Sequence, residues 1–390
     1  MTDFGASDFE RDRSSAPDNQ VVQIISDSSF TDAPAVAASP GFYLRLVLEE
    51  LKLSQAQLAS RTGLSTKHIN QLAQGLVPIS PETAILLELA LGVPSRTWNY
   101  LEASYQDARA REKSLQQLGE YTAWFANFPT KELVSRSIVD AGAAAPEQVG
   151  QVLSFFRVAN PDAYDRVWSG PVASGFRRSE NHAINPYATA VWLRCAELVA
   201  QQIDVQKYDH EKFANLLPQL RGLTRMENDR DAFASLQKLC AEAGVAVAYA
   251  REVKGSRASG AARWIHPGTP MIALSGRYSY ADSFWFSFFH EAAHVLLHAK
   301  REMYIHADVK RDNADGLEGE ANRAAVRFLV GSELAKKLRP GLTYGDVRKL
   351  ADELDVDAGI VAAQLSRAIG DYATYSRLRR KIDLDAIASH

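Results

Sequence analysis

Apolar residues recur at helical spacing along most of the chain after residue 40. Within residues 41–112, runs with apolar positions three and four apart are separated by serine, glycine or proline, which predicts five short helices. Ser54 and Ser65 are placed to cap the second and third of these helices, and Pro81 suits the first turn of the fourth. We therefore predict an all-α domain over residues 41–112.

The first 40 residues have a different character. Residues 1–40 are rich in Asp, Ser, Ala and Pro, with one short apolar run at residues 21–25. Such a composition predicts a disordered tail. It lacks the basic-then-apolar order of a signal peptide, and no later stretch approaches the roughly 18 consecutive apolar residues of a membrane span. We therefore expect a cytoplasmic protein without a membrane partner.

The remainder of the chain divides at about residue 231. Residues 113–230 keep a helical pattern interrupted by prolines and show no recognisable chemistry, which is typical of a helical linker or sensing region. Within residues 231–390, a helix precedes three short β-leaning runs, which predict a small antiparallel sheet with an edge strand near residues 271–274. Further helices follow. The fold class expected is therefore mainly α, with an α+β domain carrying the sheet.

Composition narrows the class of function. A chain of 390 residues is long enough for two or three domains, and its formal net charge of −3 excludes a generally basic nucleic-acid coat protein. The two cysteines, Cys195 and Cys240, lie in apolar helical stretches. Two isolated cysteines exclude a disulfide framework and a cysteine-rich zinc site, so we expect both to be reduced core residues.

A metal-binding pattern lies in one of the strong helices. His290 and His294 are four residues apart, so a helix places both imidazoles on one face, where they can reach a single ion. Glu291 lies beside that face and suits a general base acting on water held by the metal. The alternative is a pair of core histidines with ordinary hydrogen-bond partners. The apolar residues around this pattern favour the metal site.

A catalytic zinc usually needs a third protein ligand. A third histidine ten residues after the first is excluded, because Lys300 occupies that position. In the helix over residues 317–338, Glu318 lies at the edge of the apolar face, and Glu320 points away from it. Glu318 is therefore the better candidate ligand. Both can also be ordinary acidic residues of a first helical turn, an interpretation that suits Glu320 better. Asn322 is placed to hold a ligand from behind. His298 either does the same or is simply a residue near the end of its helix, and we favour the second interpretation.

Residues 231–328 resemble the ImmA/IrrE family of zinc metallopeptidases. The resemblance rests on β-strands, then HEAAH with a following LLH, then EGEAN. It implies a zincin-like, gluzincin-type domain that binds one Zn²⁺ per chain through His290, His294 and Glu318. It also implies cleavage of a transcriptional repressor or a related regulatory protein, often during stress.

The N-terminal helices carry a second pattern. The segments SQAQLASRTG and LSTKHINQLAQG are joined by a tight turn, as in a helix-turn-helix whose second helix enters the DNA major groove. Lys and Arg are balanced by Asp and Glu at seven each in residues 41–112, so DNA contact needs a local patch. The candidate DNA-contacting residues are those on the exposed side of the second helix: Thr66, Lys67, His68, Asn70 and Gln71.

Residues 41–112 resemble XRE-type helix-turn-helix domains, especially those of HigA-like antitoxins. The resemblance implies operator binding to double-stranded DNA, usually as a homodimer, and a toxin as an alternative partner. The sequence as a whole therefore predicts a DNA-binding regulator with zinc-dependent endopeptidase activity. The rival hypothesis is a non-proteolytic regulator or HigA-like antitoxin whose zinc domain serves as a sensor.

Overall fold

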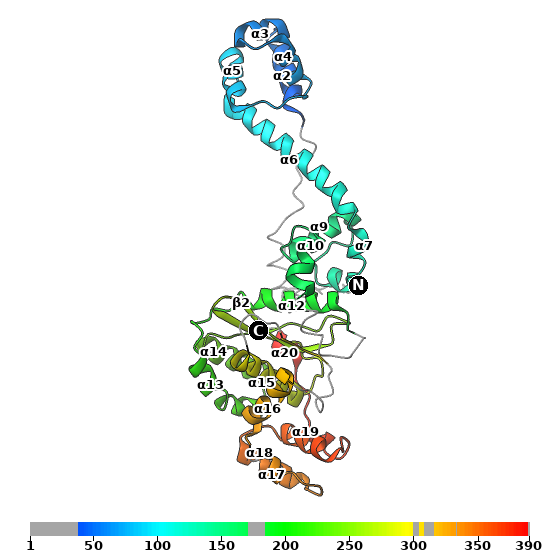
Figure 1. Ribbon diagram of the computed structural model, residues 1–390, viewed down its shortest axis with the longest axis vertical. Helices are drawn as coiled ribbons and strands as arrows, with labels where there is room; N and C mark the ends of the chain where they lie inside the picture. The colour runs from blue at the N-terminus through cyan, green and yellow to red at the C-terminus, as the bar shows by residue number, and fades with distance from the viewer. Residues whose placement is uncertain (1–37, 171–183, 299–303, 308–315, 333, 389–390) are drawn as a thin grey trace, which may run out of the picture. The chain divides into compact units, whose positions relative to one another are not determined.

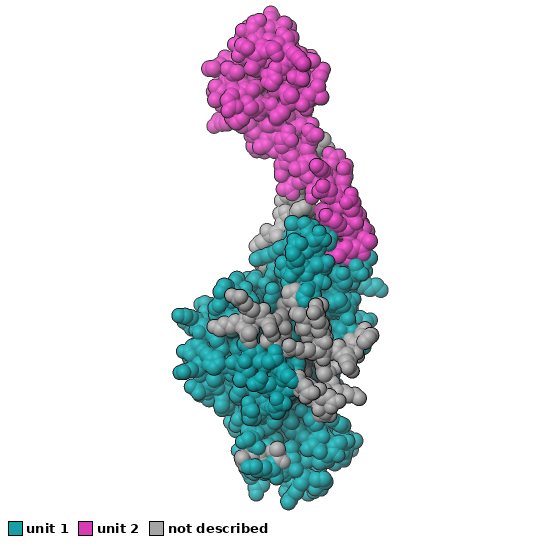
Figure 2. Space-filling view, in the orientation of Figure 1, with its two compact units in different colours: residues 1–28, 126–141, 152–390 teal, residues 29–125, 142–151 magenta. Residues whose placement is uncertain are grey.

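The computed structural model describes residues 38–170, 184–298, 304–307, 316–332 and 334–388. Most of the tail that was predicted to be disordered, residues 1–37 with the apolar run at residues 21–25, lies outside these residues. The chain divides into two compact units, coloured separately in Figure 2. One contains the described residues within 29–125 and 142–151. The other contains those within 126–141 and 152–390, so that much of the helical region after residue 113 belongs to the same unit as the sheet.

The predicted N-terminal helices form. Ser54 begins one of them with a capping box in which it pairs with Gln57, and Gly63 ends that helix at a φ of 75°, a conformation that glycine adopts without strain. Ser65 caps the next helix. A small apolar core that includes Leu58 and Ile69 holds the helices together. Their bounds are α2 Pro40–Glu50, α3 Gln55–Thr62, α4 Thr66–Ala73, α5 Pro81–Leu91 and α6 Ser95–Gly119.

Short helices connect this region to the sheet. The most buried is α12, Pro186–Ala200, which is apolar on nearly all sides and contacts β1, β2 and β3. The helices before and after it are α7 Thr122–Phe125, α8 Thr130–Ser135, α9 Ala145–Phe155, α10 Pro161–Tyr164, the π-helix η1 Asp165–Ser169, α13 His210–Leu216, the 3₁₀ helix η2 Gln219–Arg225 and α14 Asp229–Glu242. Cys195 and Cys240 are buried, and neither is in a disulfide, as predicted.

The sheet is mixed rather than antiparallel. Its strands are β1 Ala246–Tyr249, β2 Ala258–His266, β3 Thr269–Leu274 and β4 Tyr304–Ala307, in the order β1-β3-β2-β4. The tight connection from β2 to β3 makes an antiparallel pair, and β3 then lies parallel to β1 on its other side. The expected edge strand near residues 271–274 is therefore wrong, because β3 is paired on both sides, and β1 and β4 form the edges of the described sheet.

Two helices build the core beneath the sheet. They are α15, Ala281–Leu297, and α16, Gly316–Val330, which pack against each other. Figure 1 shows α12 and α15 on opposite faces of the sheet. The side chains of Ile272 and Leu274 belong to the same core cluster as the aromatic residues of α15, as alternation along a strand requires.

The start of α15 is held by the C-terminal segment of the chain. Its N-cap position is Tyr280, which makes no capping hydrogen bond through its side chain. Asp282 lies two residues further on, in the first turn of the helix, is 7% exposed, and accepts two hydrogen bonds of 2.9 Å from the Arg379 guanidinium. The final helices are α17 Leu334–Lys337, α18 Tyr344–Leu354, α19 Ala358–Ile369, the 3₁₀ helix η4 Ser376–Leu378 and α20 Leu384–Ala388.

Among the described residues, no helix has both the length and the apolar character needed to cross a membrane.

Candidate functional site

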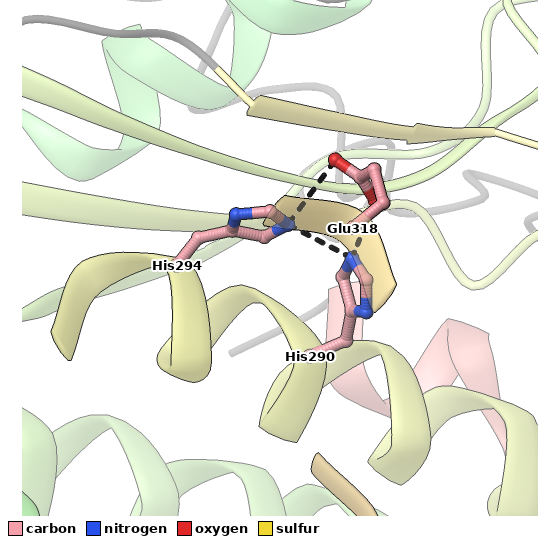
Figure 3. Close-up of side chains that lie close together, drawn as sticks. All are labelled: His290, His294 and Glu318. Carbon is pink, nitrogen blue, oxygen red and sulfur yellow. Dashed lines mark hydrogen bonds and ion pairs between the residues drawn. The ribbon is translucent and has the colours of Figure 1, made fainter. Parts of the chain in front are cut away.

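Helix α15 presents the two histidines of the sequence pattern side by side. His290 and His294 are 0% and 2% exposed, and their Nε2 atoms lie 3.0 Å apart. One helical turn separates the residues, which is why both rings project from the same face of α15. In Figure 3 the two rings converge on one point beneath the sheet.

Helix α16 brings Glu318 to the same point. Its Oε2 lies 3.2 Å from His290 Nε2, and its Oε1 lies 3.4 Å from His294 Nε2. The side chain of Glu318 is 18% exposed, whereas that of Glu320 is 50% exposed. Of the two acidic residues, the structure therefore places Glu318, the one that the sequence favoured, with the histidines.

The three donor groups fit a divalent metal ion. Their ligand atoms all lie within 4.8 Å of one another. Ligands about 2.0–2.1 Å from a tetrahedral zinc are about 3.3 Å apart, which is close to the three distances found here. Two imidazoles and one carboxylate are also donors that zinc accepts readily. The described residues can therefore hold such an ion without rearranging their side chains.

The electrostatics of the cluster favour a cation. Burial is the main reason that the pKa of His294 falls to about 4, so this ring is neutral near pH 7 and offers a lone pair. Burial alone would raise the pKa of Glu318, but hydrogen bonds to His290 and His294 outweigh it and hold that pKa far below its usual value. The site therefore carries the negative charge of Glu318 beside the neutral ring of His294.

Asn322 holds the first histidine from behind. Its Oδ1 lies 3.0 Å from Nδ1 of His290. An amide oxygen only accepts hydrogen bonds, so His290 donates through Nδ1–H and its Nε2 keeps a lone pair that faces Glu318 and His294. Its spacing after Glu318 predicted that Asn322 could hold a ligand from behind, and the structure places it against His290; that role stays a prediction.

Glu291 lies next to these residues without joining them. It is 0% exposed, and neither carboxylate oxygen has a hydrogen-bond partner among the described residues. Burial, and then the negative charge of Glu318, raise the pKa of Glu291 well above its usual range. A buried, unpaired carboxyl group is costly unless something polar is to be placed against it, which is the environment expected of a general base.

Gly260 is a functional candidate that the sequence analysis missed. A Cβ atom at this position of β2 would lie 2.7 Å from Oε1 and 2.8 Å from Cγ of Glu291. The absence of a side chain on β2 therefore makes the space that Glu291 occupies. A glycine inside a strand was the available signal, because it often marks a close approach of another group.

The candidate DNA-contacting residues lie on α4. Thr66, Lys67 and Asn70 are exposed, and His68 and Gln71 are partly buried. Opposite them, Ile69, Leu72 and Ala73 are buried in the core of the N-terminal helices. Helix α4 therefore presents a polar surface, as the recognition helix of a helix-turn-helix does.

Comparison with known proteins gave two family matches. Residues 44–98 match the helix-turn-helix family model, and residues 240–366 match the model of the peptidase M78 family, described as the IrrE N-terminal-like domain. No match was found among curated proteins. One similar solved structure is that of an addiction module antidote protein of a HigA family from Coxiella burnetii. It is 26% identical and has a TM-score of 0.21, and the alignment covers 22% of this chain and 95% of that chain.

Proposed function

Because the chain combines a helix-turn-helix DNA-binding domain with an IrrE-like domain of the M78 peptidase family, we propose that it is a regulator that also hydrolyses a regulatory protein with one bound zinc ion. The observation that carries the proposal is the cluster of His290, His294 and Glu318 beside the buried, unpaired carboxyl group of Glu291. A site that only senses zinc has no need of such a group, whereas a hydrolytic site needs a base.

The proposed reaction is attack of water on a peptide carbonyl. A zinc ion bound at this site would polarise that carbonyl and lower the pKa of water to about 7. Glu291 would accept a proton from the attacking water and pass it to the leaving amine. Asn322 would keep His290 in the tautomer that offers Nε2. The aromatic residues of α15, which are buried, would exclude bulk water from these steps.

We place the substrate chain at the β4 edge of the sheet. β4 pairs with β2 alone among the described strands, and it contacts α15, which carries Glu291. A strand edge offers unpaired backbone groups to an extended peptide, which can be bound by β-augmentation. An extended linker of a transcriptional repressor, or of another regulatory protein in a stress response, has the required form.

The helix-turn-helix would bring the peptidase to an operator, most simply as a homodimer on two half-sites. We expect Lys67→Ala to weaken binding to all DNA sequences alike and to reduce the slope of log K against log salt by about 1, because it removes one phosphate contact. Asn70→Ala should instead weaken the operator by about 1–3 kcal/mol relative to random DNA, because amide side chains read bases.

Titration of labelled duplexes at several salt concentrations measures both effects. A salt slope that stays the same after Lys67→Ala would remove this residue from the DNA interface. Equal losses on operator and random DNA after Asn70→Ala would assign it to the backbone rather than to the bases.

The proposed proteolysis is tested by mapping new protein N-termini in cells that express either wild-type protein or Glu291→Gln, before and after stress. A new N-terminus that is found only with wild type, while both purified proteins bind one zinc ion, supports the peptidase and identifies its substrate. Identical N-termini across several stresses, with zinc in both proteins, would contradict it. The rival, a zinc-sensing regulator or an antitoxin that binds a toxin, would then be preferred.

A further inference from the structure

His298 lies behind the second histidine of the cluster. It follows His294 by four residues at the end of α15, and its side chain is 1% exposed. Its Nδ1 lies 2.7 Å from Nδ1 of His294. The position mirrors that of Asn322, which contacts Nδ1 of His290 at 3.0 Å. Each of the two histidines in the cluster therefore has a polar group against the ring nitrogen that faces away from Glu318.

The protons along this contact follow from the chemistry of imidazole. A neutral ring carries one N–H and one lone pair, so a contact between two Nδ1 atoms needs one donor and one acceptor. If Nε2 of His294 offers its lone pair to a metal, its proton is on Nδ1, and Nδ1 of His298 must accept. The proton of His298 is then on Nε2, which lies 3.5 Å from Oε2 of Glu320.

We propose that His298, oriented by Glu320, is a positioning residue that fixes the ring and tautomer of His294 for zinc. The inference rests on the zinc site proposed above. It gives the two acidic residues of α16 separate roles: Glu318 would bind the metal, and the Glu320 carboxylate would attract the Nε2–H of His298 across 3.5 Å. The sequence left two interpretations of His298, and its contact with His294 favours a group that holds a ligand from behind over an ordinary residue near a helix end.

Substitution of His298 should act on zinc affinity rather than on the backbone. Groups that hold a metal-binding histidine from behind typically change metal affinity by about 10–100-fold when they are removed. His298 has a backbone φ of −116° and ψ of 165°, which any residue can adopt, so substitution does not strain the chain. Its side chain can therefore be exchanged with little effect on α15 itself.

Three substitutions at this position separate the proposed role from simple packing. Asn carries an acceptor oxygen on Cγ, at the place of the imidazole Nδ1, whereas Gln carries its polar atoms one bond further out, at the place of Nε2. We expect His298→Ala and His298→Gln to weaken zinc binding by about 10–100-fold. His298→Asn should remain within a few-fold of wild type. His266→Ala, at an exposed histidine of β2, is the matched control and should have no effect.

The measurement is competition for zinc between the full-length protein and a chromophoric chelator, with thermal unfolding of the metal-free proteins alongside. The proposal predicts changes in zinc affinity without matching changes in metal-free Tm. Glu320→Ala should cause a smaller loss than His298→Ala, because Glu320 is half exposed and its contact is longer. Equal affinities for the Asn and Gln variants would overturn the proposal, as would wild-type affinity in His298→Ala. Failure of the wild-type protein itself to bind zinc would instead contradict the zinc site.

Discussion

Replacing Glu291 by glutamine is expected to lower kcat/KM for peptide hydrolysis by about 10²–10⁴-fold, the usual contribution of a general base. Glutamine has nearly the same shape as glutamate, and neither oxygen of Glu291 belongs to the group of three metal-binding candidates. The substitution should therefore leave zinc content and folding unchanged.

The pH dependence of the hydrolysis rate provides a second test of the role of Glu291. Only the carboxylate form of Glu291 can accept a proton, so the rate should fall as the pH is lowered through the pKa of this residue. Burial raises that pKa, which places the acidic limb above the ordinary value of 4.5. The residual activity of Glu291→Gln should lack this limb.

Rates of cleavage of the mapped substrate, measured with zinc content for each protein, check both expectations. Glu211→Gln is the matched control, because Glu211 is an exposed acidic residue of α13 and should behave as wild type. Full activity in Glu291→Gln would assign the base to another group and remove the main support for the mechanism.

The second large effect is expected from Gly260→Ala. The added methyl group would lie closer to Oε1 and Cγ of Glu291 than non-bonded atoms approach, so the carboxyl group must move. A displacement of about 1 Å in a catalytic group can cost about 10²-fold in rate, and we expect a loss of kcat of this size. Zinc affinity should stay within a few-fold of wild type, because the three atoms nearest to the added Cβ all belong to Glu291 and none to His290, His294 or Glu318.

Gly268→Ala is a control in the same hairpin. A Cβ at Gly268 has no atom within 4 Å, so this variant should retain wild-type kcat. Comparison of kcat, KM and zinc affinity for the two variants, with thermal unfolding as a check on the fold, completes the experiment. A Gly260→Ala protein with wild-type kcat would show that Glu291 has room to relax, and that the glycine serves only to pack the strand.

Local signals explain why much of the architecture was predictable. The serine caps at Ser54 and Ser65 and the glycine at Gly63 act within a single helical turn, so their effect can be deduced from neighbouring residues. The spacing of His290 and His294 is likewise a property of one helix. For this reason the N-terminal helices could be predicted from the sequence alone. The same holds for the pair His290 and His294 and for Glu291 as their general base.

The order of the strands could not be predicted from local signals. The β-leaning runs were recognised, but the pairing of β3 with β1 depends on contacts between residues distant in the chain.

A tertiary contact also replaces local helix capping at Asp282. An acidic residue near a helix start usually caps it, but here the Arg379 guanidinium from the C-terminal segment binds the carboxylate.

The sequence by itself determined the chemistry on α15, because helix periodicity fixes which of its side chains share a face. It also determined the polar surface of α4. Only the tertiary structure showed that Glu318, which the sequence favoured over Glu320, meets the two histidines, because this depends on how α16 packs against α15. The roles of Gly260 and His298 depend in the same way on a neighbouring element, since each is defined by an atom that the chain brings close only when it folds.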